Sequence, residues 1–99
     1  MNYQEQNLKS GHFYGLESQL AQTQEEAAEL IQAINKYKRA RGVGQPTPKS
    51  PERTRLDLVE EIVDVSILLE QLRELLLITE REFDDLYEAK VLRTLRKMA

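Results

Sequence analysis

The sequence contains no cysteine and no tryptophan, and its 99 residues include a single histidine. The absence of cysteine excludes a disulfide scaffold, a thiolate metal site and a cysteine nucleophile. No apolar run approaches the length of about 20 residues that a membrane-spanning helix requires. The first ten residues are polar and lack the apolar stretch of a secretion signal. We therefore expect a cytoplasmic protein that contacts no membrane.

Proline is confined to one short stretch, because all three prolines lie between residues 42 and 51. The chain shows no alternating strand pattern, no internal repeat and no glycine-rich phosphate loop. Leucine, isoleucine and alanine recur instead at helical spacing. The sequence therefore predicts a single all-α domain, with helices over about residues 13–41, 55–78 and 80–97 and a loop over 42–53.

Local signals set the boundaries of these helices. Gly42 and Gly44 are expected to end the first helix, since glycine favours the conformation that follows a helix C-terminus. Thr54 followed by Asp57 is interpreted as a capping box that opens the second helix. Thr79 followed by Glu82 is interpreted in the same way for the third helix.

The apolar residues of the second predicted helix surround more of it than one neighbouring helix can cover. Association into a helical bundle is the simplest way to bury them. We therefore expect a homo-oligomer, either a dimer or a tetramer. The net charge of −3 argues against a general nucleic-acid-binding protein.

Two acidic motifs lie on the first two predicted helices. Each has two adjacent glutamates and a further acid, and the members are Glu25, Glu26 and Glu29 in the first and Glu60, Glu61 and Asp64 in the second. Residues three apart are neighbours on one helix face. The two motifs therefore each place a pair of carboxylates side by side.

The position of these acids relative to the apolar stripes is unusual. At about 100° per residue, Glu61 falls inside the leucine stripe of the second helix and Glu26 borders the stripe of the first. Antiparallel packing would make the carboxylates converge, and a cation would offset their charge. Oxygen ligands alone favour magnesium or manganese over zinc. The alternative is that the acids are ordinary solvated helix surface.

The segments E-E-A-A-E-L (25–30) and E-E-I-V-D-V (60–65) resemble the paired ExxE and ExxD signature of the MazG-like all-α nucleotide pyrophosphohydrolases. The likeness covers about residues 16–96. It implies that magnesium, or manganese, is bound by four acids: Glu26, Glu29, Glu61 and Asp64. It also implies hydrolysis of a nucleoside triphosphate, a deoxynucleotide in particular, to the monophosphate and pyrophosphate. The 31 residues between Glu29 and Glu61 form a long spacer for this family.

Further residues are candidates for the reaction itself. Either Glu25 or Glu60 could orient the attacking water as a general base. Lys90 and Arg93 on the last predicted helix could neutralise the departing phosphates. The candidates for a second phosphate clamp or for contacts with the base are Lys36, Lys38, His12 and Gln19. For each basic residue a solvated or helix-end charge is an equally open interpretation, and for His12 a structural or exposed role is the favoured one.

Two other functions compete with this hypothesis. Phosphoribosyl-ATP pyrophosphohydrolase belongs to the same superfamily and also carries acidic motifs on helices. A non-catalytic helical interaction protein would use the acids only for solubility and would not respond to magnesium.

Overall fold

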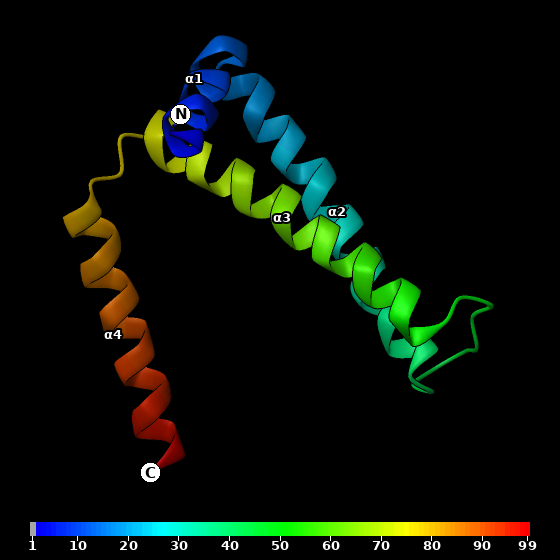
Figure 1. The fold of residues 1–99 in the computed structure, drawn as a ribbon. Helices are drawn as coiled ribbons and strands as arrows, with labels where there is room; N and C mark the ends of the chain where they lie inside the picture. The colour runs from blue at the N-terminus through cyan, green and yellow to red at the C-terminus, as the bar shows by residue number, and fades with distance from the viewer. Residues whose placement is uncertain (1) are drawn as a thin grey trace.

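The computed structural model describes residues 2–99, which form four helices and no strand (Figure 1). The helices are α1 (Tyr3–Tyr14), α2 (Leu16–Ala40), α3 (Pro51–Leu75) and α4 (Glu80–Met98). The predicted all-α class is confirmed. No helix among these residues is both long enough and apolar enough to cross a membrane.

The helix predicted over residues 13–41 is wrong at its start, because the chain breaks at Gly15. This residue has φ 88° and ψ 164°, a backbone conformation that is essentially restricted to glycine. The residues before the break form a separate helix, α1, whose N-cap is Asn2; the Asn2 side chain accepts a hydrogen bond from the Glu5 backbone N–H at 3.2 Å. Because of the break, α1 folds back and packs on the end of α3 (Figure 1).

The contact between α1 and α3 includes several hydrogen bonds of side-chain amides. The buried Gln71 amide donates to Asn7 Oδ1 at 2.7 Å and accepts a hydrogen bond from Gln19 Nε2 at 2.7 Å. Asn7 also donates to Ile67 O at 3.0 Å. A segment without an apolar stripe can therefore pack as a helix here, since its Asn7 amide is bonded to groups on α3.

The helices α2 and α3 form an antiparallel hairpin (Figure 1). As predicted, α2 ends before Gly42, which has φ 92°. The Gly42 N–H bonds to Arg39 O at 3.0 Å and the Val43 N–H bonds to Lys38 O at 2.9 Å. This pair of hydrogen bonds satisfies carbonyl groups that the end of a helix otherwise leaves without partners.

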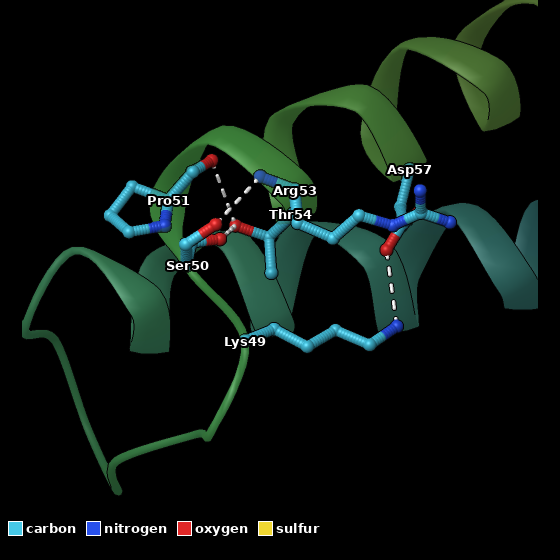
Figure 2. Close-up of polar contacts among 6 residues, drawn as sticks. All are labelled: Lys49, Ser50, Pro51, Arg53, Thr54 and Asp57. Carbon is cyan, nitrogen blue, oxygen red and sulfur yellow. Dashed lines mark hydrogen bonds and ion pairs between the residues drawn. The ribbon is translucent and has the colours of Figure 1, made fainter.

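The predicted start of the next helix at Thr54 is wrong, since α3 begins at Pro51 with Ser50 as its N-cap. Figure 2 shows Ser50 Oγ accepting the Arg53 N–H at 3.1 Å. Proline suits the first helical position because its missing N–H would have no partner there. Thr54 is only 1% exposed, and its hydroxyl donates to the carbonyl oxygens of Ser50 and Pro51.

The end of α3 also differs from the predicted one at Ile78, because the helix ends at Leu75. Leu77 adopts a φ of 57°, and the N–H groups of Leu77 and Ile78 bond back to the carbonyls of Glu74 and Arg73. The predicted cap of the last helix is confirmed, because Thr79 Oγ1 accepts the Glu82 N–H at 3.1 Å.

The last helix, α4, extends away from the other three (Figure 1). Its first turn is tied to α3 by the Arg73 guanidinium, which lies 3.6 Å from the centre of the Phe83 ring. The described residues have a radius of gyration of 16.9 Å, against about 13 Å for a compact domain of this length. Their buried hydrophobic side chains are Ala33 and Leu68 alone. The single chain thus leaves most of its apolar surface uncovered.

Candidate metal site

Three of the four acids in the predicted metal set meet between α2 and α3. The carboxylates of Glu26, Glu29 and Glu61 each offer an oxygen within 4.8 Å of the others. Asp64 lies one turn further along α3, outside this group, and its charge still raises the pKa values of Glu26 and Glu29. The antiparallel hairpin therefore makes the two sequence motifs converge.

Two oxygens in this cluster are buried without a hydrogen-bond partner, namely Glu26 Oε2 and Glu61 Oε2. The other oxygen of Glu26 accepts a hydrogen bond from Gln22 Nε2 at 3.3 Å. Buried polar atoms normally have partners, so these two oxygens lack a donor or a cation. They are the structural feature that distinguishes the cluster from solvated acids on a helix surface.

The pKa values of Glu26 and Glu29 are both raised, as expected for carboxylates that lie close together without a cation. Burial raises the pKa of Glu26 above its ordinary value of 4.5, and the neighbouring Glu61 raises it further. Contact with Glu26 raises the pKa of Glu29. Burial and the surrounding acids thus disfavour the charged forms of Glu26 and Glu29, although a hydrogen bond with Glu29 by itself lowers the pKa of Glu26. The donor set is made of oxygen only, which fits a hard divalent cation such as magnesium.

A cavity of about 370 Å³ opens beside these carboxylates. Its lining is formed by Glu29, Gln32, Ala33, Lys36, Lys49, Asp57, Glu60 and Glu61. The side chains of Lys36 and Lys49 therefore line the same cavity as the acids. A ligand that carries both a metal ion and phosphate groups would find both kinds of partner in it.

Lys49 is a site residue that the sequence reasoning missed. It lies in the loop before α3, where Lys49 Nζ pairs with Asp57 Oδ2 at 3.2 Å (Figure 2). Arg53 Nε pairs with the other oxygen of Asp57, also at 3.2 Å. Asp57 thus anchors the loop lysine at the cavity. The only signal in the sequence is the position of Lys49, directly before the N-cap residue Ser50.

The remaining predicted site residues fall into two groups. Lys36 and Glu60 line the cavity. Glu25 is exposed outside the cavity, although its charge raises the pKa of Glu29. Lys38 is exposed beside the loop at the end of α2, away from the cavity lining.

The other four predicted substrate-binding residues lie apart from the carboxylates in this chain. Lys90 and Arg93 are on α4, which packs on neither α2 nor α3. His12 is exposed on α1, with its Nε2 3.5 Å from Glu74 Oε1. The amide of Gln19 is buried and bonded to Gln71. Within one chain, the cavity lysines are therefore better placed for a phosphate than Lys90 and Arg93.

Comparisons of the chain with protein-family models, with curated proteins and with solved structures gave no match. The MazG-like family accordingly stays a prediction from the two acidic motifs.

Proposed function

We propose that the protein is a magnesium-dependent nucleotide pyrophosphohydrolase of the MazG-like kind. It would hydrolyse a nucleoside triphosphate, a deoxynucleotide in particular, to the monophosphate and pyrophosphate. The observation that carries the proposal is the convergence of Glu26, Glu29 and Glu61, with two buried oxygens that lack partners. A cavity that also contains two lysines lies next to them.

The three converging carboxylates are the residues that would hold the cation, and the acidic motif adds Asp64. A bound magnesium ion would supply charge neutralisation for the phosphate oxygens and a more acidic water. Manganese offers the same preference for oxygen ligands.

The protein's own residues account for the other parts of the reaction. Lys36 and Lys49 would bind phosphate oxygens through their ammonium groups. Glu60 lines the cavity and Glu25 does not, so we assign the general base to Glu60. Glu60 would accept a proton from the water that attacks the α-phosphorus. The bond from that phosphorus to the bridging oxygen then breaks and pyrophosphate leaves.

We further propose that the protein works as a homo-oligomer in the cytoplasm, where its substrates would be found. A core with two buried hydrophobic side chains gives a lone chain little stability. Large apolar side chains on every helix are exposed, among them Tyr3, Ile31, Ile62 and Leu86. A second copy that covers part of this surface would supply the missing burial.

A substrate panel tests the proposal. The purified protein is incubated with nucleoside and deoxynucleoside triphosphates and with phosphoribosyl-ATP, in magnesium or in EDTA, and pyrophosphate release is measured. We expect magnesium-dependent release that Glu61→Gln abolishes and the matched variant Glu17→Gln, on the exposed start of α2, retains. Release from phosphoribosyl-ATP alone would favour the second enzyme of the superfamily. No release, combined with no thermal shift by magnesium, would leave a non-catalytic helical protein.

A further inference from the structure

The charges of α4 are separated along its length. The first half, residues 80–88, holds five acids and one arginine, which gives a net charge of −4. The second half, residues 90–98, holds four basic residues and no acid, which gives a net charge of +4. A helix with this charge pattern is electrostatically complementary to an antiparallel copy of itself.

The same helix carries a continuous apolar side. Two hollows lie along it and share Tyr87 and Lys90, so they meet end to end. One has a volume of about 240 Å³ and includes Phe83 and Leu86, and the other has about 400 Å³ and includes Val91 and Leu95. Tyr87 and Leu95 are 63% and 53% exposed. Such a row of large apolar side chains is typical of a helix that packs on a partner.

Apart from the Arg73 guanidinium on the Phe83 ring, no other helix in the described part of the chain packs on this side. Among residues 2–99, α4 packs on none of the other helices, and its tie to the body is the contact between Arg73 and Phe83 at its first turn. The helix therefore presents both its apolar side and its two charged halves to another molecule.

We propose that α4 pairs in antiparallel orientation with α4 of a second copy of this chain. An antiparallel pair related by a two-fold axis places each acidic half beside the basic half of the partner, and it brings the two apolar sides together. A parallel pair would set acid against acid and base against base. The pairing rests on the homo-oligomer of the proposed function and is independent of catalysis.

Charge reversal tests the pairing in the full chain. One variant reverses three acids (Glu82→Lys, Asp85→Lys and Glu88→Lys), and a second reverses three bases (Arg93→Glu, Arg96→Glu and Lys97→Glu). Sedimentation velocity at low salt should show a wild-type dimer. In each variant alone, repulsion should raise the dissociation constant at least about tenfold, and mixing the two variants should restore the dimer.

Two controls accompany this measurement. The variant Lys9→Glu, Lys38→Glu and Arg55→Glu makes the same change of net charge as the base-reversal variant, but at exposed positions outside α4, and should stay dimeric. Circular dichroism should show that all variants keep their helix content, because the altered side chains of α4 are exposed.

Cross-linking tests the orientation, since the chain has no cysteine of its own. Glu82→Cys and Arg96→Cys variants, treated with a short bismaleimide, should cross-link when mixed and much less when alone. Cross-linking of each variant with itself would show a parallel pair and overturn the proposal.

The remaining outcomes separate this inference from the proposed function. If both reversal variants stay dimeric, α4 is not the interface, while the homo-oligomer stands. If both are monomeric and the mixture is monomeric too, α4 docks on another surface of the partner. A wild-type protein that is monomeric at all concentrations would overturn the pairing and the homo-oligomer together, and the pyrophosphate assay would decide on catalysis separately.

Discussion

The Gln71 side chain of α3 lies against the backbone of Gly11 on α1, with its Cβ 3.0 Å from the point that a Cβ on Gly11 would occupy. An alanine at this position would therefore displace Gln71 and disturb its hydrogen bonds to Asn7 and Gln19. The gain in helix propensity of about 1 kcal/mol would not offset this loss.

We therefore expect Gly11→Ala to lower the free energy of unfolding by about 1–2 kcal/mol, measured by urea denaturation. The control is Ser10→Ala, one residue away and exposed, where the gain in propensity should leave stability unchanged or slightly higher. A Gly11→Ala variant as stable as Ser10→Ala would show that α1 does not pack on α3 this closely.

Leu77 occupies a backbone position that suits glycine. Its φ of 57° is left-handed, and its side chain is 83% exposed, so little burial compensates the strain. We expect Leu77→Gly to raise the free energy of unfolding by up to about 1 kcal/mol. Thermal denaturation of the two proteins at equal concentration measures the change. The neighbouring Leu76→Gly, at a residue with negative φ, should be destabilising instead.

The two helix ends at Gly42 and Leu77 show what the sequence could and could not predict. Both use the same backbone hydrogen bonds, but only the first carries a glycine. The sequence therefore predicts the end of α2 to within one residue, whereas the predicted end of α3 lies three residues beyond the observed one. The break at Gly15 is a different case, because the sequence does contain a glycine there. The apolar residues around it keep a helical spacing, and that spacing predicts one uninterrupted helix.

The sequence likewise predicts some residues of the candidate site and not others. Helical periodicity alone predicts that Glu61 lies inside one apolar stripe and that Glu26 borders the other, and both side chains have a buried oxygen. Lys49 could not be predicted, because it reaches the cavity through a loop whose path depends on the Ser50 cap and on the pairing with Asp57. A periodic pattern specifies a helix face, but it does not specify where a loop side chain lies.

Replacing one carboxylate should have different effects on the stability of the metal-free protein and on its affinity for magnesium. In EDTA, Glu61→Gln should be at least as stable as the wild type, because it relieves repulsion with Glu26. Added magnesium should raise the melting temperature of the wild type and not of the variant. A magnesium shift that persists unchanged in Glu61→Gln would contradict the assignment of this residue as a ligand.

The raised pKa values of Glu26 and Glu29 determine whether stability rises or falls with pH. In the folded protein these groups hold their protons above the ordinary value of 4.5, so without metal their contribution to stability is largest below that value. It is lost as the pH rises through the raised pKa values. Magnesium binds the deprotonated form, so its thermal shift should be larger at roughly pH 8 than at roughly pH 5.

The variant Glu26→Gln removes one of the two groups whose pKa is raised and, with it, one carboxylate of the metal cluster, so the magnesium shift itself should also be smaller. The variant should reduce the difference in the magnesium shift between the two pH values. An equal magnesium shift at both values in the wild type would mean that these carboxylates do not bind the ion.

The two cavity lysines should act on substrate binding more than the exposed lysine beside them. Lys36→Met and Lys49→Met each remove one ammonium group from the cavity, while Lys38→Met removes one outside it. A charge-assisted hydrogen bond to phosphate contributes about 1.5–3 kcal/mol, so each cavity variant should lower kcat/KM by about 10- to 100-fold. Lys38→Met should change it less than about twofold, since exposed charges contribute little.

Steady-state kinetics of pyrophosphate release give these values, and the magnesium thermal shift serves as a second readout. The shift should persist in both lysine variants, because neither residue belongs to the metal cluster. Asp57→Asn should weaken the contact of Lys49 with the substrate phosphate indirectly. It removes the negative charge that holds the Lys49 ammonium group at a distance of 3.2 Å. If Asp57→Asn lowers kcat/KM in the wild type but adds nothing to Lys49→Met, then Asp57 acts by positioning that lysine.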